Sequence, residues 1–345
     1  MCGIIGIVSG ESVVDRLVDG LRRMEYRGYD SSGVCTLDDS GDGTRMIRRR
    51  AQGKLGNLVE VLAQEPAPGT IGIAHTRWAT HGAPTAANAH PHAGKAAALV
   101  HNGIIENFRS LRDELQADGY SVESETDSEV VALLVSREVE RGATPEDAVR
   151  TVLPRLRGAF ALAVIHADEP DHMVVCREGS PLVVGVGIGE NFIASDQLAL
   201  LPVTDRFMFL EEGDIADIRR DHIEIHDRNK QLVERAVNRF EHSQDAAEKG
   251  EYRHFMLKEI HEQPRVIRAT TEGRVTNTRV LEQALGTQAG NLLEDVRHVQ
   301  IIACGTSYHA GMVARYWIED LAGVPCSVEV ASVFRYRKHV IQPDT

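Results

Sequence analysis

Short apolar runs, each the length of a β-strand, recur along the first two thirds of the chain. The run 222–226 alternates strictly between polar and apolar residues, as a strand with one wet face does. Tight connections such as 211–214 join neighbouring runs and favour antiparallel sheets over a parallel one. The predicted strands are Gly3–Val8, Gly33–Leu37, Ile71–Thr76, Ala97–His101, Ala159–Ile165, Met173–Cys176, Phe192–Ser195, Arg206–Leu210, Ile215–Ile218 and 222–226.

Three helices are predicted between these strands from apolar stripes and end signals. The first runs from about Ser12 to near Gly28 with one apolar face. The second begins at a capping box, Thr126 followed by Glu129 three residues later. The third has Thr144 at its N-cap and a proline at its first position. Helices that accompany a strand-rich core cover its sheets, so the fold class is α+β.

The pattern changes in the last third of the chain. A polar stretch, 238–252, predicts a linker, and a helix from Tyr252 to about Thr271 follows, interrupted at Pro264. Further on, a buried strand (298–304), a turn (305–307), a helix (308–321) and a second strand (327–330) predict the opening of a parallel α/β domain. A domain of that kind needs about 100 residues or more, so we expect it to be incomplete. The predicted divisions are residues 1–237, 238–288 and 289–345.

Composition narrows the function classes. The 345 residues suffice for two domains, and the net charge of −13 disfavours nucleic acid and anionic membranes as partners. No apolar run approaches the roughly 18 residues that span a bilayer, and no secretory signal is evident, so we expect a cytoplasmic protein. The five cysteines are scattered without a C-x-x-C pair and suggest neither disulfides nor zinc. Four of them are predicted to be buried: Cys35, Cys176, Cys304 and Cys326.

Cys2 differs from the other cysteines by its position. Removal of Met1 would give Cys2 a free α-amine on the same residue as its thiol. An α-amine has a pKa near 7.7–8.0 and can serve as the general base that a thiol nucleophile needs. By itself, a cysteine in second place carries no functional meaning.

Three further positions have structural as well as chemical interpretations. Arg77, in the run 75–82, could be an ordinary surface cation. The pair Asn102-Gly103 is a common hairpin-turn dipeptide. Asp127 lies at a predicted helix start, where a carboxylate is favourable without any ligand. Taken singly, none of the three identifies a site.

Together, four segments resemble the glutaminase domain of the class II glutamine amidotransferases: 2–6, 25–31, 75–82 and 101–107. The resemblance implies an N-terminal nucleophile αββα sandwich that hydrolyses glutamine to glutamate and ammonia with Cys2. Glutamine requires a cation for its carboxylate, an anion for its ammonium group and an oxyanion site for its amide. Arg77 and Asp127 would supply the two charges, and Asn102 with Gly103 would supply the oxyanion donors.

The same resemblance implies roles for other residues around this pocket. The loop 77–82, with Thr80 and His81, would close over glutamine, and Trp78 would gate ammonia transfer. Arg27 and Gly28 would support the site. No metal and no cofactor are expected.

Residues 289–345 resemble a truncated sugar isomerase (SIS) domain. Gly305, Thr306 and Ser307 lie at its strand-to-helix turn, where backbone N–H groups and hydroxyls would bind a sugar phosphate. Among class II enzymes, the chain is most similar to those that pass ammonia to fructose 6-phosphate and make glucosamine 6-phosphate, and a homodimer is expected of the full-length form. By itself this chain is expected to act only as a glutaminase. Two alternatives stay open: another class II amidotransferase, and a non-catalytic regulator that binds phosphosugars.

Three weaker motifs are interpreted as structural. The glycines at 185, 187 and 189 resemble a nucleotide-binding loop, but no helix follows them, so a turn is predicted. The histidine pairs 90/92 and 222/226 lack a third ligand at a suitable spacing for a metal, so solvated histidines are predicted at all four positions.

Overall fold

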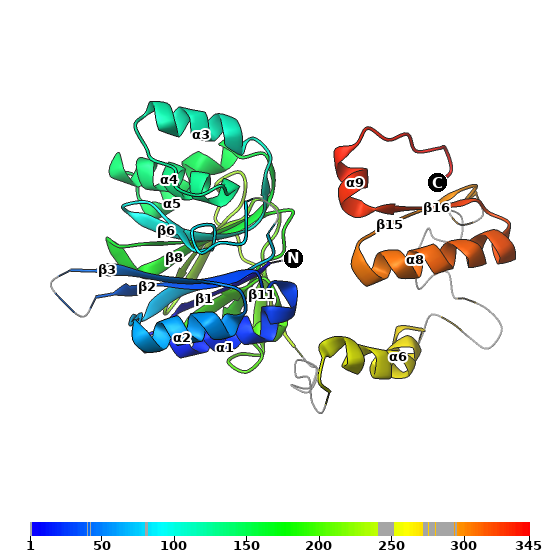
Figure 1. Ribbon diagram of the computed structural model, residues 1–345, viewed down its shortest axis with the longest axis horizontal. Helices are drawn as coiled ribbons and strands as arrows, with labels where there is room; N and C mark the ends of the chain where they lie inside the picture. Colours follow the sequence, from blue (N-terminus) through cyan, green and yellow to red (C-terminus); the bar gives the residue numbers. More distant parts are fainter. Residues whose placement is uncertain are drawn as a thin grey trace. The chain divides into compact units, whose positions relative to one another are not determined.

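The computed structural model describes residues 2–39, 41, 43–79, 82–240, 252–271, 275, 280, 293 and 295–345. The chain divides into two compact units, Met1–Phe255 and Met256–Thr345, which are described separately below (Figure 1). Among the described residues, no helix combines the length and the apolar character needed to cross a bilayer.

Two antiparallel sheets form the centre of the first unit. The order of the eight-stranded sheet is β14-β11-β9-β10-β1-β4-β2-β3, and that of the six-stranded sheet is β13-β12-β8-β7-β6-β5. The first seven strands are β1 (Gly3–Val8), β2 (Ser31–Asp38), β3 (Arg45–Gln52), β4 (Ile71–Arg77), β5 (His92–Ala93), β6 (Ala97–Ile105) and β7 (Gly158–His166). The others are β8 (Glu169–Glu178), β9 (Val183–Val186), β10 (Asn191–Ala194), β11 (Arg206–Phe209), β12 (Ile215–Arg219), β13 (Ile223–His226) and β14 (Val237–Arg239).

Helices cover the outer faces of both sheets (Figure 1). One pair, α1 (Val14–Met24) and α2 (Leu55–Gln64), shares a core with the eight-stranded sheet. A second group, α3 (Phe108–Ala117), α4 (Asp127–Glu140) and α5 (Pro145–Val152), shares another core with the six-stranded sheet. A third core lies between the sheets. The predicted αββα sandwich is therefore confirmed.

The central strand β1 shows why the sequence forms these layers. Ile5 and Ile7 point into the core beneath α1, whereas Ile4 and Val8 point into the core between the sheets. Successive side chains of a strand lie on opposite faces, and here both faces are covered. The strand is consequently apolar throughout, and its N-terminal end lies in the middle of the sheet.

Several elements of this unit were not predicted. They are β3, β5, β9, β14, α2 and α3. Strand β3 contains three consecutive arginines, which suit an edge strand because charge discourages edge-to-edge pairing. The predicted turn at 185–189 is partly wrong, since Gly185 and Val186 belong to β9. The polar stretch from 238 also begins inside a strand, because β14 pairs with β11 through Arg239.

The second unit contains the predicted β-α-β arrangement. Strand β15 (Val299–Ala303) is parallel to β16 (Cys326–Val330), and α8 (Gly305–Trp317) and a π-helical segment (Ile318–Ala322) connect them. A short helix, α9 (Ala331–Tyr336), follows. Helix α8 begins at Gly305, so the predicted turn 305–307 is the first turn of the helix.

Two predictions in the last third of the chain are wrong. Helix α6 (Phe255–Thr271) continues through Pro264, which removes one backbone donor without ending the helix. Cys304 is exposed, because it lies beyond the last residue of β15, whereas Cys35, Cys176 and Cys326 are buried as predicted. Most of the predicted linker 238–288 lies outside the described residues.

Candidate active site

The pairing of β1 with β4 brings Cys2 beside the segment that follows His75. Gly3 is opposite Thr76 in this register. Directly beyond it, the Trp78 backbone N–H donates a hydrogen bond to Cys2 Sγ over 3.2 Å. The thiol thereby lies at the N-terminal end of β1, an inner strand of the eight-stranded sheet. It is next to the segment 75–82, whose resemblance implies glutamine binding.

Burial raises the pKa of the Cys2 thiol above its ordinary value. The hydrogen bond from Trp78 and the positive charge of Arg77 act in the opposite direction but are smaller. The thiol is therefore protonated at neutral pH. A cysteine in this state needs a nearby base before it can attack a carbonyl carbon.

Asn102 and Gly103 approach Cys2 from the other sheet. They lie within β6, where they face Ala161 and Phe160 of β7, and not in a hairpin turn. The Asn102 Nδ2 group donates a hydrogen bond to the Cys2 carbonyl oxygen over 3.1 Å. Residues from both sheets thus meet at the cysteine.

Gly103 is required by its conformation and by its surroundings. Its φ of +133° lies in a region that other residues rarely adopt. A Cβ atom added here would lie 1.9 Å from the Ala159 carbonyl oxygen. No larger residue fits this position without displacing backbone.

Arg77 ends β4 and is buried, so the interpretation as a surface cation is wrong. Its guanidinium donates hydrogen bonds to the carbonyl oxygens of Ala83 (3.1 Å) and Gly82 (3.4 Å). Burial lowers the pKa of Arg77, and the negative charges of Asp30 and Asp127 partly restore it. The site thus holds a buried cation among acidic neighbours.

Asp127 is the first residue of α4 and is also buried. Its Oδ2 atom accepts a hydrogen bond from the Ile105 backbone N–H over 2.8 Å, which ties the helix to the end of β6. Thr126 caps the helix as predicted, because its side chain accepts from the Glu129 N–H over 3.3 Å. Glu129 does not complete the predicted capping box, because its carboxylate accepts from the Glu123 and Ser124 N–H groups instead. Asp127 therefore connects the start of α4 to the end of β6.

Arg27 and Gly28 lie against this region in ways that fit a supporting role. Arg27 forms a 2.5 Å ion pair with Asp196, and both side chains are largely buried. A Cβ atom at Gly28 would lie 2.6 Å from the Arg77 carbonyl carbon and 2.9 Å from the Trp78 nitrogen. The absence of a side chain at Gly28 thus lets its backbone approach the backbone of Arg77 and Trp78, which lies beside the thiol.

The remaining predicted residues are only partly placed. Trp78 is 44% exposed. Its ring centroid lies 5.6 Å from that of Tyr29, in an edge contact. Thr80 and His81 lie outside the described residues.

The predicted sugar-phosphate residues belong to the second unit. Gly305, Thr306 and Ser307 form the first turn of α8 and are exposed. Gly305 has a left-handed φ of +59°, which suits a glycine at a strand-to-helix junction.

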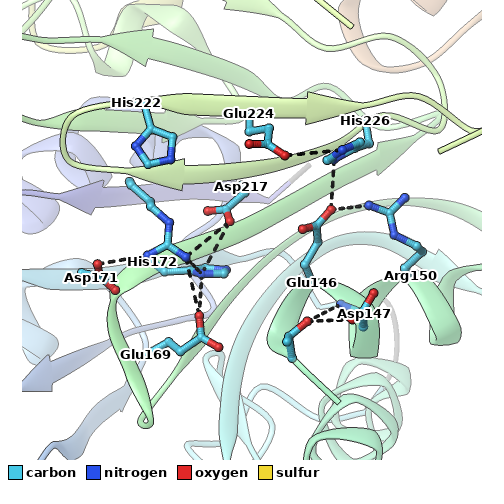
Figure 2. Close-up of polar contacts among 12 residues, drawn as sticks. Glu146, Asp147, Arg150, Glu169, Asp171, His172, Asp217, His222, Glu224 and His226 are labelled. Atoms are coloured by element: carbon cyan, nitrogen blue, oxygen red, sulfur yellow. Dashed lines mark hydrogen bonds and ion pairs between the residues drawn. The ribbon is translucent and has the colours of Figure 1, made fainter. Parts of the chain in front are cut away.

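The histidines at 222 and 226 contact different acidic side chains, and the two contacts of His226 are drawn in Figure 2. His226 contacts Glu146 at 3.1 Å and Glu224 at 3.4 Å, while His222 contacts Asp221 at 2.9 Å. In the same region, His172 Nδ1 lies 3.0 Å from Glu169 Oε2 (Figure 2). Within the described ranges, no group of three or more histidine, cysteine or acidic side chains has a geometry that would hold a metal ion.

One residue of the site was missed by the sequence analysis. His75 is fully buried, and its Nε2 atom lies 3.0 Å from Asn102 Oδ1. The available signal was a histidine directly after the apolar run 71–74, within a segment already associated with glutamine.

Comparisons with known proteins agree with this arrangement. The glutamine amidotransferase domain family matches residues 75–202, and the SIS domain family matches residues 292–345. The B. subtilis glutamine phosphoribosylpyrophosphate amidotransferase structure shares the fold, with a TM-score of 0.56 and 19% identity over 95% of this chain and 65% of that one. The two family matches and the fold therefore define a glutamine amidotransferase domain of the N-terminal nucleophile class, followed by an SIS domain.

Curated relatives identify the family more closely. The chain is 56% identical over its whole length to the isomerizing glutamine–fructose-6-phosphate aminotransferase of Pseudomonas putida, and 54% identical to that of Pseudomonas aeruginosa. It spans 56% of the length of each. The chain belongs to this aminotransferase family.

Proposed function

We propose that the first unit hydrolyses glutamine to glutamate and ammonia, with Cys2 as the nucleophile. The observation that carries the proposal is the meeting of three groups from two sheets: the Cys2 thiol, the Trp78 N–H and the Asn102 amide. Arg77 and Asp127 add one buried charge of each sign to the same region.

The proposed reaction begins after Met1 is removed. The Cys2 α-amine takes the thiol proton, and the sulfur forms a bond to the amide carbon of glutamine. Asn102 Nδ2 and the Gly103 N–H stabilise the oxyanion of the tetrahedral intermediate. The carbon–nitrogen bond breaks, the α-ammonium returns the proton to the leaving group, and ammonia departs. Water then hydrolyses the thioester to glutamate and restores the thiol.

In a longer protein of this family, we propose that the ammonia passes to fructose 6-phosphate to give glucosamine 6-phosphate, a step of hexosamine synthesis. The relatives' names and the SIS match support this proposal. Gly305, Thr306 and Ser307 would contact the sugar phosphate. The domain divisions 1–237, 238–288 and 289–345, homodimer formation and a cytoplasmic location stay predictions.

The test is ammonia release from glutamine by the purified chain and two variants. The Cys2→Ser variant should lose activity by at least about a thousandfold, since the nucleophile is removed. Cys304→Ser is the matched control, because this exposed cysteine lies in the other unit, and its activity should equal that of the original chain. Intact mass with a glutamine-analogue alkylator should show loss of Met1 and an adduct on Cys2.

Two outcomes would contradict the proposal. Activity that survives in Cys2→Ser would remove Cys2 from the mechanism. Negligible activity in all three proteins, together with binding of fructose 6-phosphate, would favour the non-catalytic regulator. Glucosamine 6-phosphate made by this chain alone would contradict the prediction that it acts only as a glutaminase.

A further inference from the structure

Four buried histidines form a cluster, and one of them, His75, contacts Asn102. His75 belongs to β4, His92 to β5 and His101 to β6, while His90 lies two residues before β5. None is more than 4% exposed, so the prediction that His90 and His92 are solvated is wrong. The His75 and His90 rings are stacked, with centroids 4.0 Å apart. The His90 and His92 rings meet edge to face at 4.8 Å. The mechanism proposed above uses none of these rings.

The rings at the centre of this histidine cluster are neutral at physiological pH. Burial lowers the pKa of His75 to about 3 and holds the pKa values of His90 and His92 well below their ordinary range. A neutral imidazole carries one N–H donor and one nitrogen acceptor. The partners of each ring therefore decide which nitrogen holds the proton.

The partners of His75 Nε2 allow only one tautomer. This nitrogen lies 3.1 Å from the His101 carbonyl oxygen, which can only accept a hydrogen bond. Nε2 must therefore carry the proton. It also lies 3.0 Å from a side-chain amide atom of Asn102, and that atom must be the oxygen, because an NH₂ group would oppose the N–H.

Once its oxygen is fixed by His75, the Asn102 amide has a single orientation. Its Nδ2 group then points to the Cys2 carbonyl oxygen, 3.1 Å away. In the flipped orientation, two oxygens would face each other at Cys2 and two donors would face each other at His75. Because the His101 carbonyl belongs to the β6 backbone, it cannot turn to relieve that conflict.

A second contact holds the His75 ring in place. The His101 backbone N–H donates to His90 Nδ1 over 3.2 Å, which fixes the ring that stacks on His75. The peptide units on both sides of His101 thereby orient the two rings, and His75 in turn orients the next side chain, Asn102.

We propose that His75 is a positioning residue that fixes the Asn102 amide with its donors toward Cys2, where the oxyanion of the glutaminase reaction would form. This inference rests on the proposed function. His75 does not touch the substrate; it acts through Asn102.

The test compares three variants in ammonia release. His75→Leu removes the donor and should lower kcat about a hundredfold, the usual effect of losing an oxyanion donor, while KM for glutamine changes less than about threefold. His75→Gln can place an amide N–H near the former Nε2 position and should recover at least about tenfold in kcat. His166→Leu is the control, because this buried histidine lies at the far end of β7 and its Nδ1 accepts only from the Asp168 N–H.

The outcomes separate this inference from the proposed function. If the original chain releases ammonia and His75→Leu keeps its kcat, or changes only KM, His75 does not position Asn102. If the original chain releases none, the proposed function fails, and nitrogen NMR of the histidines still tests the geometry. A neutral His75 protonated at Nε2 is expected, with the signal assigned through its loss in His75→Gln. A proton at Nδ1 would overturn the inference even if His75→Leu fails to fold.

Discussion

At the scale of single residues, the surroundings decide between a structural and a chemical role. The pair Asn102-Gly103 has the sequence of a hairpin turn, yet it lies inside β6. The Asn102 side chain donates a hydrogen bond to the carbonyl oxygen of Cys2, just before β1. The unusual φ of Gly103 is held by β7, whose backbone leaves no space for a side chain. This close approach makes Gly103 the glycine at which substitution should matter most.

We predict that Gly103→Ala destabilises the first unit by about 4 kcal/mol or more, because it adds a backbone clash to an unfavourable φ. The matched control is Gly119→Ala. Gly119 also has a positive φ, +88°, but a Cβ there meets nothing within 4 Å. It should cost only the conformational penalty, about 1–2 kcal/mol. Urea unfolding followed by Trp78 fluorescence in a Trp317→Phe background measures the first unit alone, and equal losses would refute the prediction.

At the scale of elements, helix caps connect stability with the site. Thr144 caps α5 at the surface, where its side chain accepts from the Asp147 N–H. Thr126 caps α4 in the interior and also lies 3.1 Å from His92 Nε2. Since Asp127 directly follows Thr126, the start of α4 places a carboxylate of the proposed site.

We predict that Thr144→Ala costs about 1 kcal/mol and leaves glutaminase kinetics unchanged, as expected of a surface cap. Thr126→Ala should cost about 2 kcal/mol or more, because it leaves buried partners unsatisfied. It should also raise KM for glutamine several-fold by moving Asp127. Urea unfolding and steady-state ammonia release measure the two effects. An unchanged KM in Thr126→Ala would show that the Thr126 cap does not determine how Asp127 is placed for glutamine.

Sequence patterns predicted these elements unevenly, for physical reasons. Strand β1 is apolar because both its faces are covered, so its pattern is strong. The edge strand β3 is rich in arginine and was missed, because an edge faces solvent and needs charge. The two-residue strand β5 was missed because it is too short to show a period.

The candidate site was predictable only through the resemblance of four segments to one family, because neither Cys2 nor Arg77 identifies a site by its residue type alone. The role of His75 was not, because it depends on an atom-to-atom contact between two sheets. Spacing along one chain segment contains no information about such a contact. The same limit applies to Arg27, whose partner Asp196 is distant in sequence.

At the scale of the whole molecule, the four layers of the first unit keep ionisable groups away from water. The histidine cluster lies where the two sheets meet, with Arg48, Arg50 and Arg77 around it. These cations and the burial itself disfavour a charged imidazole, so the pKa shifts of the rings share one direction. Folding of this unit is therefore coupled to proton release from the histidines.

This coupling predicts how stability depends on pH. In the unfolded chain, His75, His90 and His92 titrate near pH 6.5, whereas in the folded unit they stay neutral well below that value. Below pH 6.5 the unfolded state binds more protons, so the free energy of unfolding falls as pH falls; above it, these groups contribute no slope. Each ring adds about 1.4 kcal/mol per pH unit to the slope of the free energy of unfolding, so the three rings together add about 4 kcal/mol per pH unit.

Urea unfolding at pH 7.5, 6.0, 5.5 and 5.0 tests this slope above the range in which most carboxylates titrate. His90→Phe keeps an aromatic ring in the stack but removes one titrating group, so its slope should be shallower by about 1.4 kcal/mol per pH unit. Parallel curves for the original chain and His90→Phe would contradict the prediction, because a histidine adds no slope only when its pKa is the same in the folded and unfolded states.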